Sequence, residues 1–259
     1  MKLEENTFKS GLKKAGKQNQ VGLWISMCQG MAAEAIGWAG FDWTLVDMEH
    51  TPNDLSIVTS QLQALASTGT QAVVRPPWNE PVVVKRLLDI GARSLLFPMV
   101  QTPEEAAQAV AACRYPPEGI RGVAGTMRAN HFGRCTDYFE RINDEIAVLV
   151  QLETESAVAQ ASEIAAVDGV DGVFFGPADI GADLGKLGKP MDPAVWELVA
   201  PVSKKLIADG VAVGTLVSDA SFATQLLKDG YNFVACGTDM GLLNKSADNL
   251  LADMRGKLG

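Results

Sequence analysis

Two acidic residues that follow apolar runs could together hold a metal ion. Glu153 ends the segment Gln151-Leu152-Glu153, and Asp179 ends the segment Gly176-Pro177-Ala178-Asp179. Neither has a histidine or cysteine nearby in the sequence, so a site built from them would offer oxygen ligands. Such ligands suit Mg²⁺ or Mn²⁺, with waters and substrate oxygens completing the coordination, and they disfavour structural zinc. The alternative is that Glu153 caps the following helix.

A histidine and an arginine follow two other apolar runs. His50 stands three residues after Asp47, and a carboxylate beside an imidazole raises its basicity, as a general base near neutral pH requires. A single histidine is more often structural, which is the interpretation we give to His131. Arg75 could bind a substrate carboxylate or an enolate oxygen, or form a structural salt bridge with Asp47, Glu49 or Glu153; both could hold together.

Eight short apolar runs must position these side chains. Each run is almost continuously apolar, as expected for parallel strands that are covered on both faces. The runs are Val21–Met27, Trp43–Met48, Ala72–Arg75, Ser94–Val100, Ile146–Leu152, Gly172–Phe175, Val211–Val217 and Phe233–Cys236.

Helical patterns alternate with these runs, and proline or glycine marks several of their ends. The segment from Arg114 to Asn143 is irregular, with one short helix expected near Asp137–Arg141. The other expected helices are Asp54–Ala66, Glu80–Ile90, Pro103–Cys113, Ser156–Ala166, Pro193–Asp209, Ala220–Asp229 and Leu242–Lys257.

This alternation predicts an α/β fold, a closed (β/α)8 TIM barrel that occupies residues 1–259 as a single domain. The main rival is an open doubly wound sheet, but no G-x-G-x-x-G motif opens a helix after the first strand. In a barrel the carboxyl ends of the strands meet at one rim, so the polar residues named above should converge there. No lysine falls within an expected strand, which argues against a Schiff-base mechanism.

The composition excludes several other classes of protein. The 22 basic and 31 acidic residues give a net charge of −9, and the only dense basic stretch is residues 13–17, so nucleic acid is not an expected partner. The apolar runs are far shorter than the ~20 residues that span a bilayer. Residues 1–20 lack the apolar stretch of a signal peptide, and the four cysteines are scattered. We therefore expect a cytoplasmic protein without a membrane partner.

Five segments together resemble the HpcH/HpaI aldolase family, which comprises metal-dependent (class II) pyruvate aldolases such as 4-hydroxy-2-oxoheptanedioate and 2-dehydro-3-deoxyglucarate aldolases. The similarity covers nearly the whole chain, in order. The resemblance implies a pyruvate-type (β/α)8 barrel, assembled as a hexamer (a trimer of dimers) with C-terminal helices exchanged between neighbours. The segments are Phe41–His50, Val74-Arg75-Pro76, Tyr115–Gly122, Gln151–Thr154 and Gly176–Asp179.

The resemblance also implies a role for each matching residue. Glu153 and Asp179 would ligate Mg²⁺, Mn²⁺ or Co²⁺, and Arg75 would stabilise the enolate. His50, oriented by Asp47, would move the methyl proton of pyruvate. Gln151 and Glu49 would support these residues, the backbone of Gly176, Pro177 and Ala178 would hold the pyruvate carboxylate, and Asp89 would reach a neighbouring subunit's site. Leu216, Val217 and the loop 125–132 would contact the aldehyde, and Arg121 and Arg128 could meet a distal acid group.

The leading hypothesis is thus a divalent-metal-dependent aldolase that reversibly cleaves 4-hydroxy-2-oxo acids to pyruvate, or a related 2-oxo acid, and an aldehyde. One alternative is a carbon–carbon lyase that acts on acyl-CoA thioesters, as in the citrate lyase β-subunit and malyl-CoA relatives. That activity needs a basic site for the CoA phosphates, which this acidic chain lacks. The other alternative is a barrel that binds a keto acid without catalysis.

Overall fold

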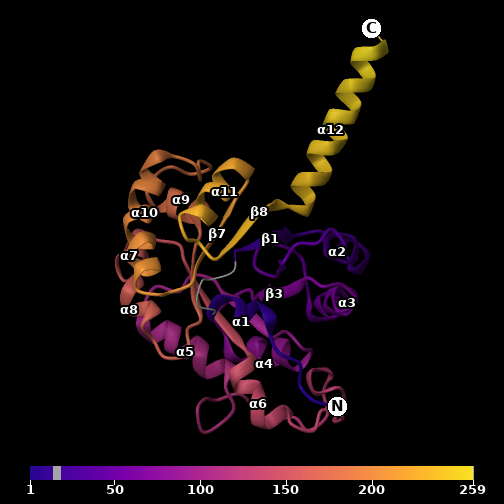
Figure 1. The fold of residues 1–259 in the computed structure, drawn as a ribbon, viewed down its shortest axis with the longest axis vertical. Coiled ribbons are helices and arrows are strands. Elements are labelled where there is room, and N and C mark those ends of the chain that lie inside the picture. The colour runs from indigo at the N-terminus through magenta and orange to yellow at the C-terminus, as the bar shows by residue number, and fades with distance from the viewer. Residues whose placement is uncertain (14–18, 259) are drawn as a thin grey trace.

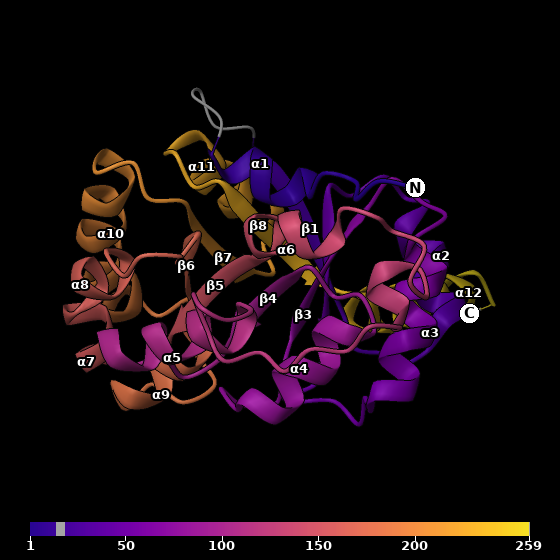
Figure 2. The same cartoon turned by 90° about the horizontal axis from the view of Figure 1, so that it is seen from below.

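A closed barrel of eight parallel strands forms the centre of the computed structural model, which describes residues 1–13 and 19–258. The strands pair in chain order, β8 closes the barrel against β1, and the helices lie outside (Figure 1, Figure 2). The expected fold is confirmed; of the basic stretch at residues 13–17, Lys14 and Lys17 lie outside the described residues. The strands are β1 (Gln20–Ile25), β2 (Trp43–Asp47), β3 (Gln71–Arg75), β4 (Ser94–Phe97), β5 (Ala147–Leu152), β6 (Gly172–Phe175), β7 (Val213–Val217) and β8 (Phe233–Thr238).

Three strands end earlier than expected, β2 by a single residue at Asp47 and β1 and β4 by more, because the backbone of the latter two finds other hydrogen-bond partners or turns. β1 ends at Ile25, because the N–H groups of the next two residues donate to the carboxylate of Asp239, at 2.9 and 3.0 Å. β4 ends at Phe97, three residues short of the expected end, and Met99 adopts a left-handed backbone with φ 51°. Both changes occur at the carboxyl rim of the barrel.

Three helices lie in segments where the sequence predicted none: α1 (Thr7–Lys13), α2 (Gly30–Gly37) and α9 (Pro177–Asp183). Two short helices, α7 (Glu155–Ala159) and α8 (Ala161–Ala165), replace one expected helix, because the backbone of Gln160 leaves the helical region. The remaining helices are α3 (Leu55–Leu65), α4 (Pro81–Asp89), α5 (Pro103–Cys113), the 3₁₀ helix η1 (Arg128–Asn130), α6 (Tyr138–Glu145), α10 (Pro193–Ala208), α11 (Ala220–Lys228) and α12 (Asp239–Leu258).

Aromatic rings fill the interior of the barrel. Phe8 of α1 packs on Trp43 and Phe233 where the strands begin, with ring centroids 5.7 and 5.8 Å away. Phe174 lies 6.1 Å from Phe233 and 5.7 Å from Trp24, which is near the carboxyl end of β1. Each of these side chains is at most 5% exposed. The interior is therefore a packed core that connects the base of the barrel to its rim.

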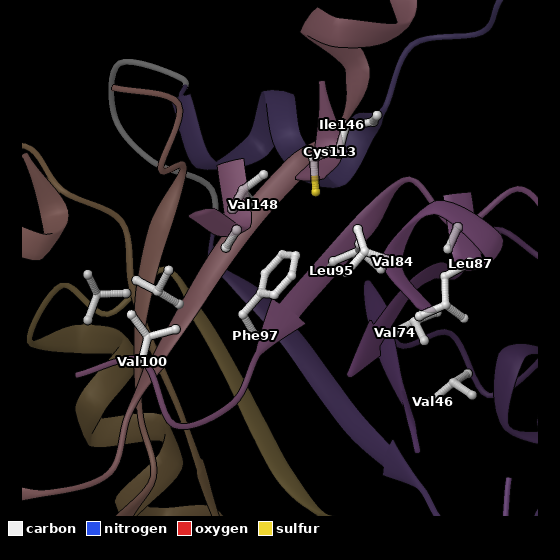
Figure 3. Packing of buried hydrophobic residues seen from close by; sticks show 14 of the residues in the cluster. Val46, Val74, Val84, Leu87, Leu95, Phe97, Val100, Cys113, Ile146 and Val148 are labelled. Atoms are coloured by element: carbon white, nitrogen blue, oxygen red, sulfur yellow. The ribbon is translucent and has the colours of Figure 1, made fainter. Parts of the chain in front are cut away.

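A second apolar layer joins the strands to the surrounding helices. Figure 3 shows Val46, Val74 and Leu95 of three neighbouring strands in one cluster with Val84 and Leu87 of α4. All five side chains are fully buried. Since both faces of the strands are covered, their nearly continuous apolar sequences are explained.

Helix α12 extends away from the barrel (Figure 1). Its only buried residue is Asp239, whereas Leu243, Leu250 and Met254 are 51%, 62% and 54% exposed. Within the described part of the chain, no helix has both the length and the apolar character needed to cross a membrane.

The tight fit of the interior predicts that Gly214→Ala destabilises the barrel. A Cβ atom at Gly214 would lie 2.3 Å from Cε2 of Phe233, and both residues are buried. Overpacking of this kind lowers the free energy of unfolding by about 1–3 kcal/mol, which urea unfolding would measure. The control is Gly69→Ala, where a Cβ meets no atom within 4 Å and stability should change little. Equal stabilities of the two variants would contradict this packing.

Candidate active site

A cavity of about 240 Å³ opens at the carboxyl ends of the strands. It collects most of the polar residues that the sequence placed at this rim. The expected residues that line it are His50, Arg75, Gln151, Gly176, Pro177, Ala178, Asp179, Leu216 and Val217. No lysine of the described residues lines it, as the absence of lysine from the strands predicted.

A larger cavity, of about 1170 Å³, lies at the opposite end of the barrel. It is lined by residues that precede strands, such as Asp171 and Ala212, and by Lys9 of α1. Lys9 is buried there and lies 3.1 Å from the carboxylate of Asp171. None of the expected catalytic or metal-binding residues lines this cavity, so the smaller cavity is the candidate active site.

The guanidinium of Arg75 is held rigidly at the base of the smaller cavity. β2 and β3 place Asp47 and Arg75 side by side in register, and Arg75 donates from Nε and Nη2 to the two carboxylate oxygens of Asp47, both at 2.8 Å. Its Nη1 lies 2.8 Å from Oε2 of Glu49, and the guanidinium lies over the ring of Trp24, 5.0 Å from the centroid. This paired and stacked cation can present only one fixed orientation to a substrate oxyanion.

The pKa values of the two acidic partners of Arg75 shift in opposite directions. Burial alone would raise the pKa of Asp47, but the hydrogen bonds and charge of Arg75 outweigh it and hold that pKa below its ordinary value. Burial raises the pKa of Glu49, although the charges of Arg75 and His50 oppose the shift. Arg75 therefore forms the expected salt bridges with Asp47 and Glu49, and it also lines the cavity.

His50 lies at the mouth of the cavity, where its side chain is 65% exposed. The sequence predicted that Asp47 orients it, but the Asp47 carboxylate accepts hydrogen bonds from Arg75 and from the backbone N–H of Glu49. The carboxylate that faces the imidazole is that of Glu49, with Oε2 3.8 Å from Nε2. The physical reason is register: Arg75 is directly beside Asp47 and binds it bidentately.

Glu153 lies below the cavity wall and is 2% exposed. Its Oε2 accepts a hydrogen bond of 2.7 Å from the backbone N–H of Met99, and its Oε1 accepts one from the side-chain amide of Gln151. Burial, strengthened by the charges of Glu49 and Asp179, raises the pKa of Glu153 to about 7. The helix-capping alternative is wrong, because the residue that caps α7 is Thr154, whose side chain accepts from the N–H of Ala157.

Asp179 lies in the first turn of α9 and is exposed to the cavity. Gly176 keeps the approach to Glu153 open, because a Cβ atom there would lie 2.9 Å from Cγ of Glu153. The N–H of Gly176 donates to Leu152 O and Pro177 has none, so the backbone donors left for a ligand carboxylate are those of Ala178 and Asp179.

The donor set fits a hard divalent cation that keeps several waters. In the described chain, no group of three or more His, Cys, Asp or Glu side chains is arranged to hold a metal, so the protein would supply only Glu153 and Asp179. Mg²⁺ is commonly held by one or two carboxylates together with water and substrate oxygens. The buried Oε1 of Gln151 has no hydrogen-bond partner, as expected where a ligand or ordered water completes the site.

Three expected ligand-contacting residues lie elsewhere. Asp89, at the end of α4, pairs with Arg121 at 2.9 Å and does not line the cavity. Arg128 donates to the carbonyl of Ile90, so both arginines lie away from the cavity of their own chain. The residues that the sequence interpretation missed are Trp24, Phe174, Pro190, Met191 and Ser218. Trp24 and Phe174 lie inside expected strands and carried no polar signal, and Pro190 and Met191 lie in a loop that gave no indication of its position.

Comparisons with known proteins agree with this geometry. The sequence model of the HpcH/HpaI aldolase/citrate lyase family matches residues 20–246. A 4-hydroxy-2-oxo-heptane-1,7-dioate aldolase of Salmonella dublin is 47% identical over 96% of this chain and 94% of that protein. A solved HpcH/HpaI aldolase/citrate lyase family protein from Burkholderia cenocepacia has a TM-score of 0.93 at 42% identity, covering 96% of this chain and 99% of that chain. The citrate lyase β-subunit of M. tuberculosis, solved with oxaloacetate and magnesium, shares only the fold, at 16% identity over 89% of this chain and 95% of that chain, with a TM-score of 0.54.

The raised pKa of Glu153 predicts how the stability of the metal-free protein varies with pH. With a pKa of about 7 when folded, against 4.5 for the ordinary group, this carboxyl binds more protons in the folded state between those values. Its contribution to stability therefore falls as the pH rises through that range. We therefore compare the urea concentrations at which Glu153→Gln and the parent protein are half unfolded, with EDTA present. Above pH 7 the midpoint of Glu153→Gln should be higher than that of the parent. Near pH 4 the two midpoints should be similar.

The matched control is Glu155→Gln, which removes an exposed carboxylate two residues away. Its unfolding midpoint should follow that of the parent protein at every pH. A difference between Glu153→Gln and the parent that stays constant with pH would contradict the assigned environment of Glu153.

Proposed function

The chain belongs to the HpcH/HpaI aldolase/citrate lyase family and is an aldolase, and we propose that it reversibly cleaves 4-hydroxy-2-oxo acids to pyruvate, or a related 2-oxo acid, and an aldehyde. One observation carries this proposal: a cavity that no lysine of the described residues lines has a rigidly held guanidinium at its base and an acidic pair beside it. An enolate needs such electrostatic stabilisation when no Schiff base can form.

We propose Glu153 and Asp179 as the ligands of Mg²⁺, Mn²⁺ or Co²⁺. Such an ion would polarise the carbonyl of the 2-oxo acid. Gln151 orients Glu153 through its amide and lines the cavity with its other atoms. The N–H groups of Ala178 and Asp179, at the start of α9, are free to bind the substrate carboxylate.

Arg75 and His50 would carry out the remaining steps, which are stabilisation of the negative oxygen and transfer of the proton. Arg75 holds the oxygen that becomes negative when the carbon–carbon bond breaks, and its ion pairs prevent it from moving away. His50 accepts or returns the proton at the methyl carbon, and Glu49 stabilises the protonated imidazole. The apolar side chains of Leu216, Val217 and Met191 form the wall that contacts the aldehyde.

The proposal includes an oligomer in which α12 packs against a neighbouring subunit, as a trimer of dimers. The exposed leucines and methionines of α12 support this, because an isolated helix with this much apolar surface gains stability only by covering it. In that assembly Asp89, which does not contact the cavity of its own chain, would approach a neighbour's site.

The chain is proposed to act as one barrel domain in the cytoplasm. Its four cysteines are free, as expected in a reducing compartment.

Metal dependence is tested by pyruvate release from a panel of 4-hydroxy-2-oxo acids. We expect EDTA to abolish release and Mg²⁺, Mn²⁺ or Co²⁺ to restore it, and Glu153→Gln and Asp179→Asn to weaken metal binding at least tenfold, roughly what loss of a liganding carboxylate produces. Asp183→Asn, one turn further along α9, is the matched control and should keep both properties. Release that continues in EDTA, or a borohydride-trapped pyruvate adduct on lysine, would overturn the mechanism. A malyl thioester in the panel tests the acyl-CoA alternative.

The role of His50 is tested by exchange of the pyruvate methyl protons in D₂O. His50→Ala should keep metal affinity while exchange slows by about 10²–10⁴, the usual contribution of a positioned general base. Measured by proton NMR, unchanged exchange in His50→Ala combined with its loss in Glu49→Gln would assign the proton transfer to Glu49 instead. Absence of exchange in the parent protein would favour a non-catalytic binder.

Assembly through α12 is tested by sedimentation. Replacing Leu250 and Leu251 together by glutamate should yield smaller particles, because charge on the apolar surface opposes packing. Lys245→Glu, on the same exposed helix, should leave the sedimentation coefficient unchanged. A parent protein that sediments as a monomer would contradict the oligomer.

A further inference from the structure

A third cavity lies at the end of the barrel opposite the candidate active site and, like that site, has a volume of about 240 Å³. Arg93, which directly precedes β4, and Arg128 of η1 both line it. Both arginines also line an adjoining cavity of about 270 Å³, so they stand between two open spaces. His131 adds a third nitrogen-bearing side chain, and among the described residues Glu4 is the only acidic one that lines the cavity of about 240 Å³.

Neither guanidinium group forms an ion pair among the described residues, although the charges of Glu145 and Glu4 act on Arg93. Each uses Nη1 for a backbone carbonyl at 2.6 Å, Arg93 for that of Glu4 and Arg128 for that of Ile90. Neither makes a second hydrogen bond within the described chain, and no unpaired nitrogen of either side chain is buried. The remaining N–H groups of both side chains are therefore available to a ligand.

Two of the buried arginines among the described residues, Arg75 and Arg121, differ from Arg93 and Arg128. Arg75 and Arg121 are each paired with a carboxylate, and although burial acts against them, these partners raise the pKa of each guanidinium. Burial lowers the pKa of Arg128 with no carboxylate to oppose it, and it lowers the pKa of Arg93 more than Glu145 and Glu4 raise it. A half-buried cation whose burial is not offset by a paired carboxylate favours an anion from outside.

The chain holds Arg128 in place by two unusual local features. A Cβ atom at Gly91 would lie 2.7 Å from Nη1 of Arg128, and Gly91 has φ +99°, so only glycine permits this approach. After η1, His131 and Phe132 have left-handed backbones with φ 52° and 58°. Such strain persists where surrounding contacts enforce it, and buried Asn130 supplies them through hydrogen bonds to Met127 N, Gly133 N and Gly125 O.

We propose that this cavity binds the carboxylate or phosphate group of a small organic anion, held by Arg93 and Arg128. Phe132, which is 61% exposed, and Tyr138 supply apolar surface for the body of the ligand. The volume matches that of the candidate active site, so the ligand is of similar size to its substrate. This site does not depend on the reaction proposed above, because it shares no residue with the catalytic cavity.

Isothermal titration of the protein with EDTA present tests the proposal, since the proposed metal site in the catalytic cavity would then hold no ion. Succinate and inorganic phosphate are the two probes, and saturable binding of one identifies which oxyanion is preferred. We expect Arg128→Gln to weaken that binding about tenfold or more, as loss of a charge-assisted hydrogen bond predicts, and Arg128→Lys to retain part of it. Arg134→Gln, an exposed arginine of the same loop outside the cavity, should bind as the parent does.

Two results would overturn the proposal. One is equal affinity in the parent, Arg128→Gln and Arg134→Gln, which would mean that the probe binds elsewhere. The other is no saturable binding of either probe to the parent protein; if Arg128→Gln then also alters sedimentation, the occupant is an acidic side chain of a second copy. Thermal melts of each variant, compared with the parent, show whether a loss of binding reflects misfolding.

Discussion

The ion pair between Arg75 and Asp47 is the interaction on which the site depends. Arg75 is 5% exposed at the rim of the barrel, and a guanidinium so buried is stable only if carboxylates compensate its charge. Parallel pairing of β2 and β3 supplies one carboxylate directly beside it, and Glu49 supplies another two residues later. Trp24 supports the guanidinium from below and belongs to the aromatic column that fills the barrel. The packing of the core thereby fixes the position of a single charge at the cavity.

The same arrangement gives two acidic residues opposite properties. Asp47 is bound to a cation and has a lowered pKa, so it remains charged and serves to hold Arg75. Glu153 forms no ion pair among the described residues, and burial raises its pKa to about 7, so a divalent ion would both displace its proton and gain an oxygen ligand. Two carboxyl groups whose pKa values are shifted in opposite directions are typical of an active site in which they have different roles. His50 is then left to act with Glu49 at the mouth.

The strands and the rim residues could be predicted from the sequence because each carries a strong signal. Continuous apolar runs identify strands covered on both faces, and Arg75 or Gln151 at their ends stands out against that background. Helix α1 could not be predicted, since only Phe8 and Leu12 of its polar sequence enter the core. The sequence also did not indicate which of the rim residues form ion pairs with one another. Strand register, not proximity in the chain, joins Asp47 to Arg75 rather than to His50.

Crystallography of the protein with Mn²⁺ and pyruvate tests the central claim most directly, because Mn²⁺ is located by its anomalous scattering. We expect one ion in contact with carboxylate oxygens of both Glu153 and Asp179, with pyruvate bound beside it and one pyruvate oxygen within hydrogen-bond distance of Arg75. An ion bound elsewhere would contradict the proposed metal site. Pyruvate bound in the cavity without contact to the ion or to Arg75 would contradict the proposed mechanism.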